Sequence, residues 1–328
     1  MSKVLTLLQE SGDAFRSGEA MSQELGITRA AVWKQIKRLR ESGYEIEAVT
    51  NLGYRLKGSP ERLDAERILE MLKEHPWRDR ITVLESVDST NSLAKREALA
   101  GAPHGSVYLS DEQTGGRGRL GRSFLSARGK GLYLSVLLRP DCAPTQVGHV
   151  TAMAAVAACN AVERCCGVRP GIKWTNDLIL GEKKMTGILS EMSVEWESGT
   201  LEYVVVGIGI NCSQRPEDFP EELQNRATSI QMETGQTVDR CLLAAELIRE
   251  LEKLSRELIT GKATWIARYA EDCITLGREV RIIRGEQVRT GTAKAIDENG
   301  ALVVRYDNGE TGIVFTGEVS IRGADGYL

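Results

Sequence analysis

The chain has 328 residues, 41% of them hydrophobic and 27% charged, a composition that argues against disorder and allows two or three globular domains. The net charge of -4 excludes a general attraction to nucleic acid, so any DNA contact requires a local basic patch. Seven cysteines without a C-x-x-C pair argue against a disulfide framework or a zinc site, and no segment has the apolar length of a signal peptide or membrane span. We therefore expect a soluble protein of the reducing cytoplasm, without membrane contact.

Residues 1–60 are predicted to form short helices followed by a β-hairpin. Gly26 separates two helical patterns, and in the second one Val32, Ile36 and Leu39 recur at the spacing of one buried helical stripe. Thr28 can cap the N-terminus of this second helix. Its basic residues are Arg29, Lys34, Lys37, Arg38 and Arg40, with no acidic residue before Glu41. The helix therefore carries a local basic patch on an acidic protein.

A helix, a short turn with glycine and a basic helix are typical of a helix-turn-helix, whose second helix enters the major groove of DNA. Residues 44–56 indicate two strands around Asn51 and Gly53, a hairpin wing. Because these features occur together and in this order, we predict a DNA-binding winged helix. The alternative is a solvated basic face on a small helical cap. The candidate DNA contacts are Thr28, Arg29, Ala30, Trp33, Lys34 and Lys37.

After a linker at Ser59-Pro60, strand patterns alternate with helical ones. The expected strands are 81–87, 106–110, 131–138, 185–196 and 201–211. The expected helices are 90–101, 151–165 and 238–259. This alternation predicts an α/β or α+β domain with a mixed sheet.

From about residue 275 the pattern changes to short strands separated by Gly, Asn and Asp turns. The expected strands are 279–283, 290–296, 301–307, 311–315 and 319–322. Five short strands with such turns predict a small barrel of the SH3-like kind.

The stretch "GGRGRLGR", residues 115–122, matches the G-x-G-x-x-G dinucleotide fingerprint in Gly116, Gly118 and Gly121. That fingerprint requires a hydrophobic strand before the glycines and a helix after them, whereas a polar segment precedes this stretch and a loop follows it. The alternation of glycine with Arg117, Arg119 and Arg122 instead indicates a mobile clamp for anions. A disordered basic loop and an RNA-binding RGG segment are the alternatives, but both normally repeat.

Four polar clusters interrupt the apolar strands of the middle segment, where ligand-binding groups tend to gather. They are "DSTN" (88–91), "EQTGGRGRLGR" (112–122), "KWTNDL" with "KKMTGIL" (173–178 and 183–189) and "GIGIN" (207–211). Each has an ordinary explanation by itself. The first is a typical helix cap, Lys184 fits a surface lysine, and the glycines of the last fit close packing against a neighbour.

In order and spacing, however, the four clusters resemble those of the biotin protein ligases, also called biotin-[acetyl-CoA-carboxylase] ligases. The N-terminal helix-turn-helix makes the chain similar to their bifunctional form, the biotin operon repressors. The sequence departs from the family pattern at Thr175, where proline is common, and at Phe124, where tryptophan is common. Neither change removes a charged group.

The resemblance covers nearly the whole chain and implies an α+β protein of three domains. These are a winged helix-turn-helix domain (1–60), a mixed-sheet ligase domain similar to class II synthetases (61–273) and an SH3-like barrel (274–328).

The family's reaction, as the resemblance implies it, joins the biotin carboxylate to the α-phosphorus of ATP, giving biotinoyl-5′-AMP and pyrophosphate. A lysine of the biotin carboxyl carrier protein then takes the acyl group. Two anions must meet, so the site has to supply positive charge. The residues that match the family's catalytic positions are Lys184, Arg117 and Arg119, while Gly116 and Gly118 let the loop fold over the adenylate.

Further residues match the family's substrate-binding positions. Those around biotin are Ser89, Thr90, Asn91 and Gln113, together with Arg117, Gly118, Arg119 and Lys184. Those expected at the nucleotide are Arg117, Arg119, Arg122, Asn176, Asp177 and Asn211, with Asp177 also a candidate ligand for Mg²⁺.

The resemblance implies biotin and ATP as substrates with Mg²⁺, and the carrier protein, operator DNA and an adenylate-bound homodimer as partners. A lipoate protein ligase is the nearest alternative enzyme. The alternative from another class is a DNA-binding repressor that senses a ligand without turning it over. The arginine loop and Lys184 favour an enzyme, and the loop together with the winged helix favours biotin.

Overall fold

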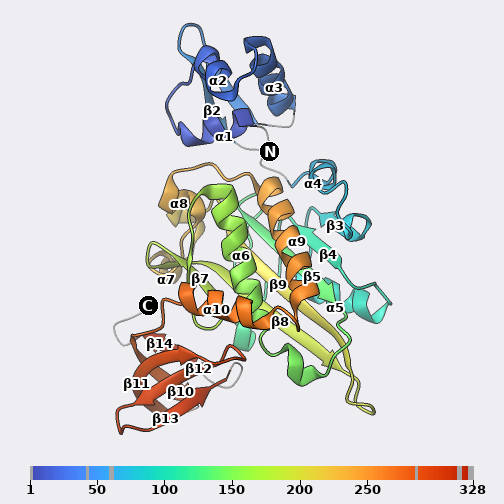
Figure 1. Ribbon diagram of the computed structural model, residues 1–328, viewed down its shortest axis with the longest axis vertical. Helices are drawn as coiled ribbons and strands as arrows, with labels where there is room; N and C mark the ends of the chain where they lie inside the picture. The colour runs from blue at the N-terminus through green and yellow to red at the C-terminus, as the bar shows by residue number, and fades with distance from the viewer. Residues whose placement is uncertain (1–2, 42–43, 59–62, 285–286, 316–319, 324–328) are drawn as a thin grey trace.

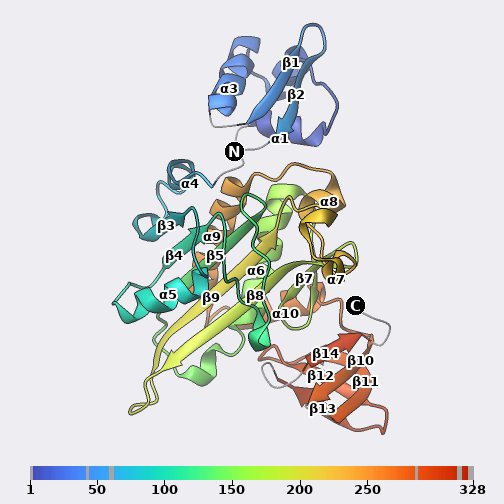
Figure 2. The same ribbon diagram turned by 180° about the vertical axis from the view of Figure 1, so that it is seen from behind.

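The computed structural model describes residues 3–41, 44–58, 63–284, 287–315 and 320–323. These residues form three separate sheets, of two, seven and five strands. In Figures 1 and 2 the seven-stranded sheet lies in the middle of the molecule, with the N-terminal helices and hairpin at one end and the five-stranded sheet at the other.

The N-terminal unit has the predicted helices and hairpin. Its elements are α1 (Lys3–Glu10), α2 (Gly18–Leu25), α3 (Arg29–Glu41), β1 (Glu45–Val49) and β2 (Gly53–Gly58). Gly26 ends α2 in the left-handed conformation with φ 63°, which turns the chain between α2 and α3. Val32, Ile36 and Leu39 are buried in one core with Met21 and the apolar residues of α1, so the predicted stripe of α3 is confirmed.

The middle unit is a mixed sheet in the order β3-β4-β5-β9-β8-β7-β6. Its strands are β3 (Ile81–Leu84), β4 (Ser106–Ser110), β5 (Gly131–Leu138), β6 (Gly171–Lys173), β7 (Asp177–Leu180), β8 (Lys183–Val194) and β9 (Leu201–Asn211). Only the β3–β4 pair among these neighbours is parallel, so the predicted mixed sheet is confirmed. Its helices are α4 (Ala65–Met71), α5 (Thr90–Leu99), α6 (Val150–Cys166), α7 (Glu221–Gln224), α8 (Ile230–Thr234), α9 (Arg240–Glu257) and α10 (Lys262–Asp272).

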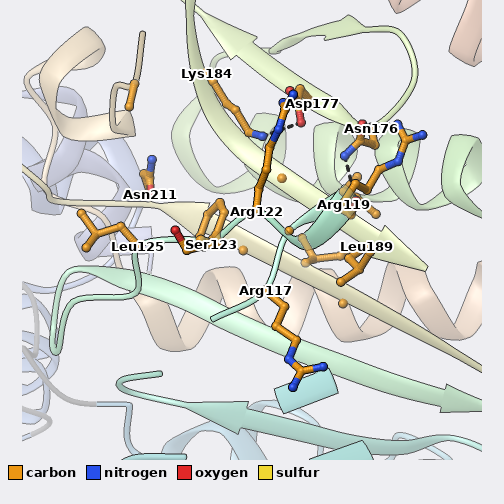
Figure 3. Close-up of a pocket in the computed structure, with 18 of the residues that line it drawn as sticks. Arg117, Arg119, Arg122, Ser123, Leu125, Asn176, Asp177, Lys184, Leu189 and Asn211 are labelled. Carbon is orange, nitrogen blue, oxygen red and sulfur yellow. Dashed lines mark hydrogen bonds and ion pairs between the residues drawn. The ribbon is translucent and has the colours of Figure 1, made fainter. Parts of the chain in front are cut away.

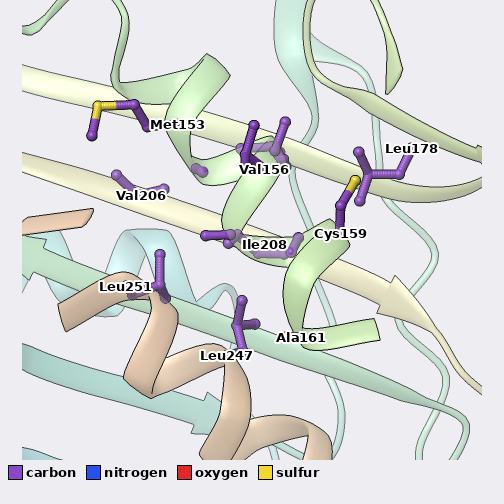
Figure 4. Packing of buried hydrophobic residues seen from close by; sticks show 14 of the residues in the cluster. Met153, Val156, Cys159, Ala161, Leu178, Val206, Ile208, Leu247 and Leu251 are labelled. Carbon is purple, nitrogen blue, oxygen red and sulfur yellow. The ribbon is translucent and has the colours of Figure 1, made fainter. Parts of the chain in front are cut away.

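The main core lies between this sheet and helices α6 and α9 (Figures 1 and 4). Because side chains alternate between the faces of a strand, Val206, Ile208 and Ile210 of β9 enter this core, and Gly207 and Gly209 face the other way. Helix α6 contributes a run of buried alanines, whose small side chains let it approach the sheet closely. The opposite face of the sheet thus has glycine positions that leave room above them.

The C-terminal unit is an antiparallel sheet in the order β13-β12-β11-β10-β14. Its strands are β10 (Glu279–Arg284), β11 (Gln287–Ile296), β12 (Leu302–Tyr306), β13 (Thr311–Val314) and β14 (Ser320–Gly323). All five predicted strands are present. Within the described residues β13 and β14 stand at the two edges of the sheet, so closure into an SH3-like barrel stays a prediction.

Arg67 of α4 joins the N-terminal unit to the middle one. Its guanidinium donates to the Tyr44 hydroxyl, lies 4.7 Å from the centre of the Tyr44 ring and forms an ion pair with Asp239. Tyr44 belongs to the N-terminal core, and Asp239 caps α9 by accepting from the Leu242 backbone amide at 3.1 Å. The Asp239 side chain is only 2% exposed, so the ion pair with Arg67 helps to compensate a buried charge.

We expect Arg67→Ala to lower the free energy of unfolding by about 3–5 kcal/mol, because it leaves the Asp239 carboxylate buried and unpaired. Urea denaturation of the full chain measures this loss. Arg78→Ala is the matched control, because Arg78 pairs with Asp79 at the surface and should cost no more than about 1 kcal/mol. Equal losses in the two variants would contradict the role given to Arg67.

Candidate active site and DNA-binding helix

A pocket of about 680 Å³ opens over the glycine-bearing face of the middle sheet. Its floor includes Gly187 of β8 and Gly207 and Gly209 of β9. Segments far apart in the sequence line it: the start of α5, the arginine loop, the stretch 173–177, β8, β9 and the region 219–227. The four polar clusters of the sequence therefore meet in one cavity.

The arginine loop forms a tight hairpin at this pocket. Gly118 donates its amide to the Arg122 carbonyl at 2.7 Å, and Phe124 donates to the Gly116 carbonyl at 2.9 Å. At the tip, Leu120 and Gly121 have φ values of 57° and 73°. After a single short 3-10 turn at Arg119–Gly121, the chain reaches β5 without a helix. The dinucleotide interpretation is thereby excluded, as the flanking sequence predicted.

Two of the loop arginines differ in their surroundings. Arg119 Nη1 donates to Asn176 Oδ1 at 3.0 Å, and Asn176 Nδ2 donates in turn to the Ile188 carbonyl at 2.9 Å. Burial lowers the pKa of Arg119, and nearby Asp177 opposes this change. Arg117 is exposed and extends away from the Arg119–Asn176 pair in Figure 3. One end of the loop is thus held against the pocket wall, while Arg117 reaches outward.

Lys184 of β8 also lines this pocket. Its Nζ is 2.7 Å from Asp177 Oδ1 (Figure 3). The backbone amide and carbonyl of Lys184 bond to Arg226 O at 2.8 Å and to Thr228 N at 2.9 Å, which fixes this part of β8. The described residues contain no group of three or more His, Cys, Asp or Glu side chains that could hold a metal ion. The role of Asp177 as a ligand for Mg²⁺ stays a prediction.

The predicted biotin residues occupy the α5 end of the pocket. Gln113 Oε1 accepts from the Thr90 backbone amide at 2.8 Å, and Gln113 Nε2 donates to Ser126 Oγ at 2.8 Å. Thr90, Asn91 and Gln113 line the cavity. Ser89 does not line it: this buried side chain caps α5 through the Ser92 amide. The "ordinary cap" explanation therefore holds for Ser89, and its neighbours reach the pocket.

Phe124 and the floor glycines are fitted to one another. A Cβ atom at Gly209 would stand 2.5 Å from Phe124 Cε1, and one at Gly187 would stand 3.2 Å from Phe124 Cε2. The Phe124 ring therefore rests directly on the two strands, which accounts for glycine at these positions. This position, where tryptophan is common in the family, thus still carries an aromatic ring.

Two pocket residues, Asn211 and Trp174, form hydrogen bonds to segments behind the pocket wall. Asn211 lines the pocket, donates Nδ2 to the Thr228 carbonyl at 2.9 Å and accepts from Gln214 Nε2 at 3.0 Å. Trp174 donates its indole N–H to the Gly300 carbonyl at 3.0 Å, which ties the pocket wall to the C-terminal sheet. The Trp174–Thr175 peptide, at the family's proline position, is cis.

Positive charge dominates the lining. The only carboxylate among the lining residues is Asp177. The cationic lining residues are Arg117, Arg119, Arg122, Lys173, Lys184, Arg226 and Arg281. Sequence reasoning included Lys173 in a polar cluster without giving it a role, and it missed Arg226 and Arg281, of which Arg281 comes from the C-terminal sheet. A chain of net charge -4 thus gathers cations at one cavity, which can hold an anion with several negative charges.

The second helix of the N-terminal unit presents its basic face to solvent. Thr28 caps α3, accepting from the Ala31 amide at 3.2 Å, as predicted. The candidate DNA contacts are all exposed, and these are Thr28, Arg29, Ala30, Trp33, Lys34 and Lys37. Trp33 is 58% exposed, with the Lys37 ammonium 5.9 Å from its ring centre. The predicted contacts thus share an exposed face of α3, and their role in DNA binding stays a prediction.

Two further predictions concern the chain's surroundings. All seven cysteines are free thiols. Among the described residues, no helix combines the length and apolar character needed to cross a membrane.

Three family descriptions match consecutive parts of the chain. They are an HTH domain over residues 1–55, the biotin/lipoate A/B protein ligase family over 83–211 and the biotin protein ligase C terminal domain over 275–322. The chain therefore belongs to the class of proteins that join an N-terminal helix-turn-helix domain to a biotin/lipoate ligase domain.

Two curated relatives match this chain over nearly its whole length. The chain is 36% identical over 307 residues to the bifunctional ligase/repressor BirA of Bacillus subtilis, covering 93% of this chain and 94% of the relative. It is 31% identical over 328 residues to the protein of that name from Escherichia coli, covering 98% and 97%. A solved structure, the Aquifex aeolicus biotin protein ligase in complex with biotin and ATP, matches with a TM-score of 0.63 and 29% identity over 74% of this chain and 99% of that one. The chain belongs to the family of bifunctional biotin protein ligases and repressors.

Proposed function

We infer that this protein attaches biotin to a carrier lysine in an ATP-dependent reaction and represses transcription in response to biotin. The observation that carries the enzymatic part is the pocket lining, in which arginines and lysines surround a single carboxylate over a glycine floor. Biotin carboxylate and ATP are both anions, and their reaction requires such a concentration of positive charge.

We propose the following roles for the pocket residues. Lys184, Arg117 and Arg119 stabilise the negative charge that develops on the reacting carboxylate and α-phosphate oxygens. The loop that carries Arg117, Arg119 and Arg122 closes over the adenylate as a clamp, and closure excludes water from a mixed anhydride that would otherwise hydrolyse. The proposed biotin-binding residues, besides the loop and Lys184, are Ser89, Thr90, Asn91 and Gln113, with Ser89 acting through the cap of α5. Asn176, Asp177 and Asn211 are proposed to border the nucleotide.

We propose that Mg²⁺ enters as a complex with ATP and that Asp177 is a candidate ligand for it. Asp177 lines the pocket and its Oδ1 lies 2.7 Å from Lys184 Nζ, so it would have to exchange this ion pair for the cation to act as a ligand.

Incubating the purified protein with ATP, labelled biotin and a carrier domain tests the proposal. We expect label on one carrier lysine and pyrophosphate release that depends on biotin. Activity with lipoate in place of biotin would favour the alternative enzyme. A protein that binds biotin and DNA yet labels no carrier would be a ligand sensor.

We expect Arg119→Ala to release biotinoyl-AMP about 10- to 100-fold faster, because one charge-assisted hydrogen bond is worth about 1.5–3 kcal/mol. The fold should be unaffected, since Arg119 lies in a glycine-flanked loop and contacts Asn176 rather than the core. Adenylate retention is measured by rapid filtration after a single turnover. Arg128→Ala is the control, because Arg128 follows the same loop but pairs with Glu112 outside the pocket lining. Unchanged retention in Arg119→Ala would refute the clamp.

For the regulatory part, we propose that α3 reads operator DNA and that two adenylate-bound copies bind together. We also propose the domain limits 1–60, 61–273 and 274–328, a class II synthetase-like ligase domain and a C-terminal SH3-like barrel. A cytoplasmic location stays a prediction from the cysteine pattern.

A further inference from the structure

The Asn91 amide at the pocket floor is held by groups from three strands. Asn91 Nδ2 donates to the Leu189 carbonyl at 3.1 Å and to Glu191 Oε2 at 2.9 Å, both on β8. Asn91 Oδ1 accepts from Ser135 Oγ of β5 at 2.6 Å. Opposite it on β9 is Gly207, where a Cβ atom would stand 1.9 Å from Asn91 Oδ1. The amide is therefore packed flat against the floor.

These contacts fix which end of the amide is the acceptor. An amide nitrogen has two hydrogens, and both are used by acceptors of β8. If the amide were rotated by half a turn, its oxygen would face the Glu191 carboxylate and the Leu189 carbonyl, which are both acceptors. Asn91 therefore offers no donor hydrogen to a ligand, whereas Oδ1 keeps a second lone pair.

Glu191 is in turn held by Lys95, whose Nζ lies 2.6 Å from Glu191 Oε1. Lys95 is one turn along α5 from Asn91, so the ion pair joins the helix that carries Asn91 to the strand that orients it. The Lys95 and Glu191 side chains are each 29% exposed, and neither lines the pocket. Their influence on a ligand must pass through Asn91.

We propose that Glu191, anchored by Lys95, is a positioning residue for biotin: it binds Asn91 Nδ2 and thereby presents Oδ1 as an acceptor to a ureido N–H. This rests on the proposed function, because the ureido ring has two N–H donors that need acceptors. A pair that merely ties α5 to β8 would contribute to stability but would not discriminate between biotin and ATP.

The test measures biotin and ATP binding separately by titration calorimetry on the full chain. Glu191→Ala should weaken biotin binding about tenfold, with ATP affinity and kcat at saturating biotin each changing less than about threefold. Glu191→Gln, which keeps an acceptor oxygen but loses the charge, should fall between wild type and Glu191→Ala, and it serves if the alanine variant folds poorly. Glu202→Gln is the matched control, because exposed Glu202 on the same hairpin contacts Ser193 and not Asn91.

A double-mutant cycle distinguishes positioning of Asn91 by Glu191 from a purely structural role of Glu191. In an Asn91→Ala background, Glu191→Ala should change biotin affinity less than about twofold, because its target is gone. An undiminished effect in that background, or equal weakening of biotin and ATP, would overturn the positioning role. A wild-type protein that binds no biotin at all would overturn the proposed function itself, and with it the ligand named for Asn91.

Discussion

Replacing Lys184 by alanine is expected to slow biotinoyl-AMP formation by about 10²–10³-fold, the effect of removing one preorganised group at a developing charge. The ammonium lies at the pocket in an ion pair of 2.7 Å with Asp177, and the backbone of Lys184 is bonded on both sides, so its position needs little rearrangement. The substitution also removes the cation that lies 2.7 Å from Asp177, so this carboxylate adds more repulsion toward the proposed nucleotide. Single-turnover formation of adenylate from labelled biotin and ATP measures the rate.

Two companion variants identify the cause of the loss. Lys183→Ala is the matched control: Lys183 is adjacent in sequence, but its Nζ donates to the Gln224 carbonyl at 3.1 Å and it does not line the pocket. Its rate should stay within about threefold of wild type, as for a substitution remote from the reacting groups. Adding Asp177→Asn to Lys184→Ala should restore ATP affinity without restoring the rate, since it removes the repulsion but supplies no cation. Wild-type adenylate formation by Lys184→Ala would remove this lysine from the reaction.

Much of the fold was predictable because the hydrophobic patterns of single segments match the strands and helices that these segments form in the structure. The predicted strands 106–110, 131–138 and 201–211 coincide with β4, β5 and β9, where continuous apolar runs are bounded by polar or glycine residues. The N-terminal helices were predictable for a related reason: the helical spacing of Val32, Ile36 and Leu39 selects one buried face. Helix α10 and the short strands β6 and β7 were missed. The strands lie on either side of a polar stretch whose pattern gives no strand period.

The candidate site was predictable only where a cluster has a sequence pattern. Arginines alternating with glycines indicate an anion-binding loop, but nothing in the loop predicts that Arg119 bonds Asn176, which is 57 positions away. Ser135 offered a weak signal as a polar residue inside the apolar strand 131–138, and it proves to bond both Thr90 and Asn91. Arg226 and Arg281 gave none, because an isolated arginine has the same sequence context at a pocket as on an open surface.

The winged helix raises a question of affinity, because a single recognition helix makes few phosphate contacts and the protein's net charge of -4 adds no general attraction. Two copies on an inverted repeat would add their contacts. We therefore expect biotin with ATP to strengthen both self-association and binding to an inverted repeat upstream of biotin genes, more than either ligand alone. By linkage, the operator should favour the adenylate-bound dimer in return. Sedimentation and gel-shift titrations with and without the adenylate measure the coupling.

Replacing both Lys34 and Lys37 by alanine should reduce operator affinity at least about 100-fold and leave ligation unchanged, since each DNA-contacting side chain is worth roughly 1–3 kcal/mol. Both lysines are exposed on α3, in the unit that Figure 1 places at the far end of the molecule from the C-terminal sheet. The salt dependence of binding should also become shallower, because fewer counterions are released. Lys73→Ala with Lys294→Ala is the matched control: it removes the same charge from exposed positions outside the helix-turn-helix and should leave operator binding intact. If both double variants bind the operator equally well, α3 does not read DNA through this face; if operator affinity ignores the adenylate, the protein is a ligase whose winged helix is not coupled to its pocket.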